Sequence, residues 1–171
     1  MLSWDNLRAT TVDDAARHWQ IVREQGLDCP FDVFVQVFHE HFGRSDVPAL
    51  TAAVDWSAVS WTEETLSGDA LRQVYVDRRF ARAVDEARVL TREEGLYDER
   101  LAVVAAWQRQ QTWAVAPVLL SGNVTGNGHR YDLLVGNSRL GNLLGLLDRG
   151  DVPDTLRHRV WVGSIIAREA P

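Results

Sequence analysis

The stretch that decides the fold is residues 131–147, which read YDLLVGNSRLGNLLGLL. Its first five residues form a short, mostly apolar segment typical of a strand. Gly136 follows this segment directly and allows a sharp reversal of the chain. The leucines that follow recur at the spacing of one helical face: Leu140, Leu143, Leu144 and Leu147. The stretch therefore predicts a strand, a tight glycine turn and a helix, with Gly150 as the helix stop.

Further strands are predicted on both sides of this unit. Residues 116–120 form a short apolar strand with Pro117 near its start, where a missing amide is tolerated. Residues 122–128 are rich in glycine and asparagine and favour a hairpin or an irregular loop. Residues 159–162 predict a last strand. The C-terminal third thus reads as strand, loop, strand, glycine turn, helix and strand.

The N-terminal part is predicted to be helical over residues 1–50. Thr11 is the expected cap of a first helix, with Asp14 placed to reach back to the cap amide and Gly26 as the stop. A second helix is expected after Pro30, ending at Gly43. It carries one apolar stripe at helical spacing: Phe31, Phe34, Val35, Phe38 and Phe42. The expected role of this stripe is core packing.

Residues 51–115 combine strand and helix patterns. Residues 54–62 are rich in β-branched and aromatic side chains and predict one or two strands, followed by a turn at residues 67–69. Two helices are expected next, on either side of Gly95. Their apolar faces are Phe80, Ala83, Val84, Ala87 and Leu90 in the first, and Leu101, Val104, Ala105 and Trp107 in the second. The chain is therefore predicted to be α+β, with residues 1–50 a helical extension and residues 51–171 the core.

The composition excludes several mechanisms, because the 171 residues contain no lysine. A Walker A loop, a Schiff base, a serine–lysine dyad and the kinase strand lysine all need a lysine amine. Arginine supplies all 18 basic residues against 24 acidic ones, a formal net charge of −6. This charge argues against a protein that binds nucleic acid without sequence preference, because such proteins neutralise the phosphates with Lys and Arg. Any phosphate site must rely on arginine and backbone amides.

Cysteine and hydropathy patterns predict a cytoplasmic protein. Cys29 is the one cysteine, so neither an internal disulfide nor a Cys-x-x-Cys site can form. The N-terminus lacks the pattern of a signal peptide, and no apolar stretch approaches the roughly 20 residues of a membrane span. We therefore expect no membrane partner.

The turn after residue 135 is the candidate binding site. A helix that starts directly after a strand points its unpaired amides and the positive end of its dipole beyond the end of that strand. Gly136 permits close approach of a ligand, Ser138 offers a hydroxyl, and Arg139 offers a planar fork suited to a phosphate or carboxylate. Gly136, Asn137, Ser138 and Arg139 are thus the predicted phosphate-binding residues. The competing interpretation is a structural turn with a surface arginine.

The order of these segments resembles the core of the ParB/sulfiredoxin superfamily. Residues 117–120, 131–143, Gly150 and 158–163 carry the resemblance, which covers about 50 residues well. In that family a strand ends in a glycine-x-x-arginine turn that opens a helix. The resemblance implies a small mixed β-sheet with flanking helices. It also implies that Gly136 and Arg139 contact nucleotide phosphates.

Two motif positions depart from the family pattern. Asn137 stands where sulfiredoxins have their reactive cysteine, and Cys29 lies in a separate helical region, so sulfiredoxin chemistry is not expected. Ser138 stands where a histidine or glutamate is usual, and a hydroxyl is a poor general base. Catalytic residues therefore remain unassigned. The chain also ends soon after the last strand, where ParB proteins carry a helix-turn-helix module, which argues against DNA segregation.

The resemblance implies a nucleotide- or phosphate-binding protein whose ligand is a nucleoside di- or triphosphate with Mg²⁺. If the protein is an enzyme, the family suggests nucleotide hydrolysis or phosphoryl transfer. An alternative is a non-catalytic interaction module, such as a toxin-neutralising or adaptor protein, with a protein partner. A nuclease is a third interpretation, which the acidic charge disfavours.

Other residues were weighed as functional candidates. His39 and His41 project about 200° apart on a regular helix, so one ion cannot readily be held by both and no metal site is predicted.

Three carboxylates could position a nucleophile or Mg²⁺, namely Glu63, Glu64 and Asp132. The ordinary role of the two glutamates is to lie on the solvated surface. Arg78 and Arg79 precede or begin a predicted helix, where they either close over a nucleotide or form surface ion pairs. Trp113 and Trp161 are expected near the sheet, where either ring could stack on a base or belong to the core.

Overall fold

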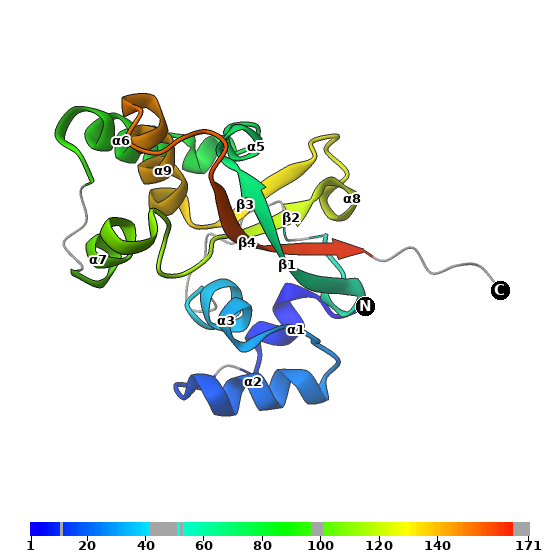
Figure 1. The fold of residues 1–171 in the computed structure, drawn as a ribbon. Helices are drawn as coiled ribbons and strands as arrows, with labels where there is room; N and C mark the ends of the chain where they lie inside the picture. The colour runs from blue at the N-terminus through cyan, green and yellow to red at the C-terminus, as the bar shows by residue number, and fades with distance from the viewer. Residues whose placement is uncertain (11, 42–50, 52, 97–100, 166–171) are drawn as a thin grey trace.

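A four-stranded mixed sheet forms the centre of the described structure (Figure 1). The computed structural model describes residues 1–10, 12–41, 51, 53–96 and 101–165. The strand order is β1-β4-β2-β3, and the strands are β1 (Val59–Ser67), β2 (Val118–Ser121), β3 (Tyr131–Val135) and β4 (Arg157–Ile165). β4 runs antiparallel to β1 and parallel to β2, while β2 and β3 pair antiparallel. The α+β prediction with a small mixed sheet is confirmed.

The predicted strand, glycine turn and helix are present as β3, Gly136 and α9 (Asn137–Arg149). Gly136 has φ 118°, and a Cβ there would lie 2.7 Å from the Cβ of Pro117, so only glycine fits both the backbone conformation and the space. α9 ends at Gly150, which is left-handed as expected of a C-terminal stop. The sharp turn at Gly136 therefore lets α9 begin directly after the end of β3.

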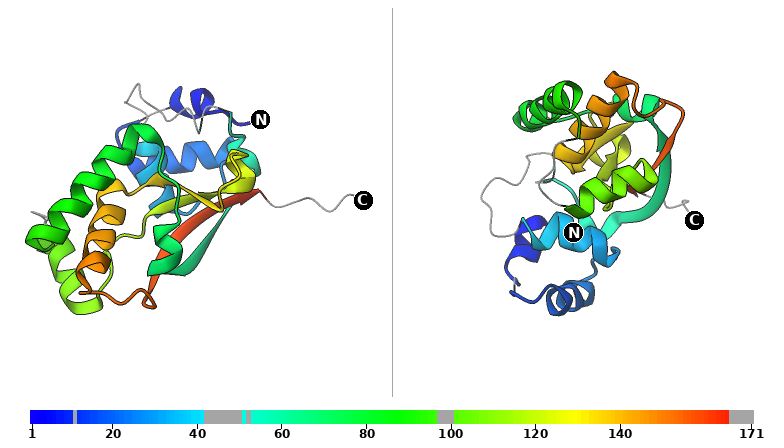
Figure 2. Two further views of the ribbon diagram at one scale, coloured as in Figure 1. Left: turned by 90° about the horizontal axis from the view of Figure 1, so that it is seen from above. Right: turned by 60° about the vertical axis from the view of Figure 1, so that its left-hand side comes forward.

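Helices cover both faces of the sheet, and each face has its own hydrophobic core (Figures 1 and 2). Successive residues of a strand point to opposite faces, so Leu119 of β2 joins the core under α9 while Val118 and Leu120 join the other. The α9 leucines all lie in the first core: Leu140, Leu143, Leu144 and Leu147. None of the described helices is both long and apolar enough to cross a membrane.

On the first face, α6 (Arg78–Glu94) lies alongside α9 at very short range (Figure 2). A Cβ added to Gly141 would lie 2.5 Å from the carbonyl oxygen of Val84, and one added to Gly145 would lie 2.6 Å from that of Arg88. Two glycines one helical turn apart thus let the two backbones touch. α7 (Leu101–Gln110) also belongs to this side, with Trp107 in the same core.

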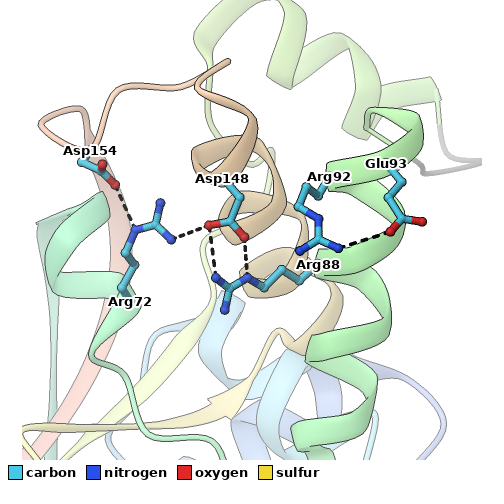
Figure 3. Close-up of polar contacts among 6 residues, drawn as sticks. All are labelled: Arg72, Arg88, Arg92, Glu93, Asp148 and Asp154. Carbon is cyan, nitrogen blue, oxygen red and sulfur yellow. Dashed lines mark hydrogen bonds and ion pairs between the residues drawn. The ribbon is translucent and has the colours of Figure 1, made fainter.

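An ion-pair cluster closes the outer end of this face (Figure 3). The carboxylate of Asp148 on α9 accepts hydrogen bonds from Arg72 Nη1 at 2.7 Å and from Arg88 Nε at 2.6 Å. Arg72, at the end of α5 (Gly68–Arg72), also donates from Nε to Asp154 at 3.0 Å. The cluster therefore joins α5, α6 and α9 to the segment that leads into β4.

On the second face, the N-terminal helices pack through aromatic rings. These helices are α1 (Trp4–Arg8), α2 (Ala15–Glu24), α3 (Phe31–Val33) and the π-helix η1 (Phe34–His39). The ring of Phe38 lies 5.6 Å from that of Trp4 and 5.0 Å from that of Trp56. Phe34 and Phe38 are fully buried, which confirms their core role, whereas Phe31 is 39% exposed. Phe42 and Gly43 lie outside the described residues.

Two details of the N-terminal prediction differ in the structure. α2 begins at Ala15 because Asp14 is its cap, with the Asp14 carboxylate accepting from Arg17 N at 2.7 Å. The predicted cap, Thr11, lies outside the described residues. The helix after Pro30 is also not a regular α-helix throughout, since it continues from α3 into the wider π-helix η1.

The predicted strand at residues 54–62 lies further along the chain. Asp55 caps a short 3₁₀ helix, η2 (Trp56–Ala58), and its carboxylate also accepts from Leu2 N at 2.7 Å. β1 therefore begins at Val59 and extends to Ser67. Ser67 then caps α5, so the predicted turn at residues 67–69 is a helix start, and residues 122–128 begin with a helical turn, α8 (Gly122–Thr125).

Candidate functional site

The N-terminus of α9 has the geometry expected of an anion site. Its first intrahelical bond is Leu140 N to Gly136 O, at 2.9 Å, so the amides of residues 137–139 precede the hydrogen-bonded ladder. Its N-cap is Gly136, which has no side chain, and no other described side chain caps this helix start. Asn137 is half-buried and Ser138 is exposed. The turn thus presents backbone N–H groups and a hydroxyl at the end of β3.

Arg139 is held in place by oxygen atoms from two other segments. Its Nη1 donates to Gln36 Oε1 at 2.6 Å, to the carbonyl of Val115 at 3.0 Å and to that of Ala116 at 3.1 Å. Its Nε lies 3.3 Å from the position of a Cβ on Gly136. The guanidinium therefore lies beside the turn and also joins α9 to η1 and to the segment before β2. The four predicted residues, 136–139, lie together because they are consecutive in the turn. The contact of Arg139 with Gln36 was not predicted from the sequence.

A cavity of about 360 Å³ lies beside this contact and shares Gln36, Val115 and Ala116 with it. Gln36 is 7% exposed, and its Nε2 has no hydrogen-bond partner in the described part of the chain. The opposite wall comes from the sheet and includes Trp161 of β4. No local sequence pattern indicates this cavity, because its walls come from four separate parts of the chain, at residues 31–40, 63, 114–116 and 159–161.

The three candidate carboxylates do not gather at the turn. Asp132 is buried and accepts from Thr125 Oγ1 at 2.6 Å and from Asn127 Nδ2 at 2.5 Å. Glu64 accepts from the Tyr131 hydroxyl at 3.0 Å, while burial and this carboxylate raise the pKa of Tyr131. Each of these carboxylates is thus engaged by a donor of the protein.

The third candidate carboxylate, Glu63, lines the cavity and not the turn. Its Oε2 accepts from Arg159 Nη1 at 3.4 Å. Among the described residues, no group of three or more His, Cys, Asp or Glu side chains is arranged to hold a metal ion. The described donors therefore do not build a protein-held Mg²⁺ site.

The histidine pair that the structure does form is His18 with His39. Their Nδ1 atoms lie 3.2 Å apart, and His18 is fully buried on α2. Burial lowers the pKa of His18, and the neighbouring His39 lowers it further. His39 thus meets His18 on another helix, a pairing that depends on how two helices pack and has no signal in the local sequence.

The two candidate tryptophans have different surroundings. Trp113 is 2% exposed, and its Nε1 donates to the carbonyl of Arg159 at 2.6 Å, so it belongs to the core. Trp161 is partly buried and lies in the cavity wall. At the start of α6, Arg79 forms an ion pair with Asp77 at 2.9 Å, which matches the surface-pair interpretation.

Comparisons with models of known protein families, with curated proteins and with solved structures found no match. The resemblance to the ParB/sulfiredoxin superfamily therefore rests on the order and spacing of the sequence segments.

Proposed function

We propose that this protein binds a phosphate group, carried by a nucleoside di- or triphosphate, at the N-terminus of α9. The observation that carries the proposal is the start of α9, where no side chain caps the helix, a left-handed glycine precedes it and an arginine lies in its first turn. The resemblance to a nucleotide-binding superfamily favours a nucleotide as the carrier of the phosphate.

Backbone amides supply the main attraction in this arrangement. The N–H groups at the start of α9, which precede its hydrogen-bonded ladder, and the positive end of the helix dipole favour a bound anion. Gly136 is buried, and Pro117 and Arg139 fill the space where its side chain would be, so its part is to form the sharp turn into α9. Ser138 is exposed at the same helix end and can donate its hydroxyl hydrogen. A phosphate needs no lysine to be held here.

Arg139 supplies the positive charge. Its Nη1 is already fixed by three oxygen atoms, which restricts the rotamers of a long side chain. A restricted side chain loses less conformational entropy when it contacts a ligand. A charge-assisted hydrogen bond from this guanidinium contributes about 1.5–3 kcal/mol in typical cases.

The proposal covers binding and assigns no catalytic base. The side chains in the first turn of α9 are an amide, a hydroxyl and a guanidinium, and none of these accepts a proton readily near neutral pH. Hydrolysis or phosphoryl transfer, which the resemblance suggests, would need a base from elsewhere. Phosphate release during the binding experiment is therefore measured as a separate readout.

The test is calorimetric titration of the intact protein with ATP, ADP, CTP and GTP, with and without Mg²⁺. Ser138→Glu is the decisive variant, because it places a carboxylate where the phosphate would bind. A carboxylate at a helix N-terminus also stabilises the helix by about 0.3–1 kcal/mol, so loss of binding would not reflect unfolding. We expect at least a tenfold loss of affinity in Ser138→Glu, while the neutral control Ser138→Gln stays within about threefold of the wild type.

Two results would contradict the proposal. One is that no nucleotide binds to the wild-type protein, and the other is that Ser138→Glu binds as well as Ser138→Gln. A stoichiometric protein partner whose binding is independent of nucleotide, isolated from the native host, would instead favour the non-catalytic interaction module.

A further inference from the structure

The two edges of the sheet differ in how their backbone groups are used. At the β3 edge, Tyr75 N donates to the carbonyl of Tyr131 at 2.9 Å, and Leu133 N donates to the carbonyl of Tyr75 at 2.8 Å. This edge is therefore covered at that point. β1 forms the opposite edge (Figure 2), and among the described residues it pairs with β4 alone.

The backbone groups of every second residue of β1 face the open edge. Trp161 of β4 donates its N–H to the carbonyl of Pro117 at 3.0 Å, toward β2, and it is the ladder partner of Glu63. Opposite residues of an antiparallel pair either exchange hydrogen bonds or both turn their backbone groups away from each other. The N–H and C=O of Glu63 therefore face outward. By the alternation of such pairs, so do those of Trp61 and Thr65.

A second set of contacts agrees with this direction. Thr65 is the ladder partner of Arg159, and the carbonyl of Arg159 accepts from Trp113 Nε1, outside the ladder with β1. The carbonyl of Thr65 accepts from the side chain of Arg157. Apart from this bond, the outward N–H and C=O groups between residues 61 and 65 have no hydrogen-bond partner in the described part of the chain. The middle of β1 therefore offers unused donors and acceptors.

β1 is long and regular, and little in the strand itself prevents pairing. Its ladder with β4 runs over nine residues, Val59–Ser67, without a register shift. The strand contains no proline, and its exposed side chains are Thr62, Glu63 and Thr65. A long, open edge of this kind is a template for another strand, and native proteins ordinarily cover or interrupt it. A partner strand is therefore the expected occupant.

The charges at this edge indicate the kind of partner. β1 supplies Glu63 and Glu64, and β4 supplies two arginines that reach over β1. Arg159 Nη1 lies 3.4 Å from Glu63, and Arg157 bonds to Thr65. The edge is thus balanced in charge, although the chain as a whole carries −6. A balanced strip favours neither a strongly basic nor a strongly acidic partner, and it lets two acidic copies of this chain meet without like-charge repulsion.

We propose that two copies of this chain pair antiparallel through β1, about a twofold axis at Thr62, and so join two four-stranded sheets into one. In this register the outward groups of Trp61 exchange hydrogen bonds with those of Glu63 of the second copy. Thr62 lies opposite Thr62 of the second copy, which is a favourable pair. An axis at Glu63 or Glu64 would place two glutamates opposite each other, which is destabilising. The proposal is independent of phosphate binding at α9, because β3 lies at the other edge.

Sedimentation equilibrium of the full chain tests the pairing. We expect a species of twice the chain mass at micromolar concentrations. Glu63→Pro is the decisive variant, because proline has no N–H and its ring obstructs the outer edge, while the ladder with β4 does not use this amide. Glu63→Ala loses the same carboxylate and keeps the amide. We expect dimerisation at least tenfold weaker in Glu63→Pro and within about threefold of the wild type in Glu63→Ala. A monomeric wild type, or equal dimerisation of the two variants, would overturn the proposal.

A crosslink tests the register and does not require the proline variant to fold. Opposite residues that exchange no hydrogen bonds have Cα atoms about 4.5 Å apart, a separation that a disulfide can bridge. Thr62→Cys should therefore form a disulfide-linked dimer under mild oxidation. Thr65→Cys makes the same substitution at another exposed position of β1 and should stay unlinked, because its two copies lie at opposite ends of the paired segment. The native Cys29 is buried. Equal linkage of both variants, or none in Thr62→Cys, would overturn the pairing at Thr62.

Discussion

The two faces of the sheet are held together in different ways. On one face, Gly141 and Gly145 bring the backbone of α9 against that of α6, and the Asp148 ion pairs close the outer end. On the other face, the N-terminal helices pack through large rings and are joined to α9 by the contact of Arg139 with Gln36. Direct backbone packing leaves no room for a ligand between α6 and α9. Ring packing around a π-helix leaves a cavity and an amide with an unsatisfied donor.

The first turn of α9 and the cavity both adjoin the N-terminal helices through Gln36. α9 uses its leucines and glycines to close one face, and its first turn meets the N-terminal side through Arg139. The four predictions below test the contrast between the two faces, from the largest expected effect to the smallest.

Gly141→Ala should cause the largest loss of stability. Intrinsic propensity favours alanine over glycine in a helix by about 1 kcal/mol, but the new Cβ would overlap the carbonyl of Val84. Because that neighbour is backbone, we expect a net loss of about 3 kcal/mol, at the upper end of overpacking costs. Denaturant unfolding measures it. Arg82→Ala, at an exposed site on α6, is the control and should change stability by about 0.5 kcal/mol or less. An unchanged or raised midpoint for Gly141→Ala would show that the two helices are not in backbone contact.

His158 should make the stability depend on pH. Burial lowers its pKa to about 4, so the folded protein keeps it neutral where an unfolded chain binds a proton. The unfolded state therefore binds more protons between pH 6.5 and pH 4, and stability falls as the pH is lowered through that range, by at most about 3 kcal/mol. His158→Asn should remove most of this slope and leave the smaller part that His18 contributes from the other face. The same slope in wild type and variant would disprove this assignment.

Gln36→Leu should loosen the N-terminal face selectively. It removes a hydrogen bond from a charged donor, and such bonds contribute about 2 kcal/mol. Hydrogen exchange should become faster in α2 and η1, while the amides of α9 that pack on α6 keep their protection. Uniform acceleration over both faces would mean that the two faces unfold as one unit.

Asp148→Asn changes the carboxylate at the centre of the contacts drawn in Figure 3. It should have the smallest of the four effects, about 1 kcal/mol, because its arginine partners are partly exposed to solvent. Hydrogen bonds from Arg88 and then Arg72 hold the pKa of Asp148 below its usual value. This contribution is therefore present near neutral pH and is lost as the pH falls below about 4. Unfolding experiments at pH 7 and pH 3 should show the variant losing its disadvantage at the lower pH. Glu93→Gln, which affects an exposed pair with Arg92, is the control.

Local sequence patterns predicted those secondary-structure elements that depend on interactions between residues close together in the chain. The strand, the glycine turn and the helix at residues 131–149 follow from apolar spacing and from a turn that requires glycine, and the structure confirms them. The boundaries that were wrong involve competing caps. Asp14 starts α2 where Thr11 was expected, and Asp55 forms a 3₁₀ helix where a strand was expected. Several residues in each stretch could cap, and tertiary contacts select among them.

The features that were missed depend on distant segments. Arg139 and Gln36 are 103 positions apart, so no local pattern could reveal their contact. The π-helix also escapes a search for the 3.6-residue period, and it is this segment that carries Gln36. Gly141 and Gly145 were visible in the sequence, but their role depends on α6 lying against them. The turn before α9 could thus be predicted, and the cavity beside it could not.

The most direct test of phosphate binding at α9 is a titration of the isotope-labelled protein with ATP, followed by backbone amide NMR. If the phosphate binds at this turn, the largest shift changes occur at residues 136–140 and in the Arg139 side chain. These changes vanish in Ser138→Glu and persist in Ser138→Gln. Shift changes confined to other parts of the chain, or equal changes in both variants, would contradict it.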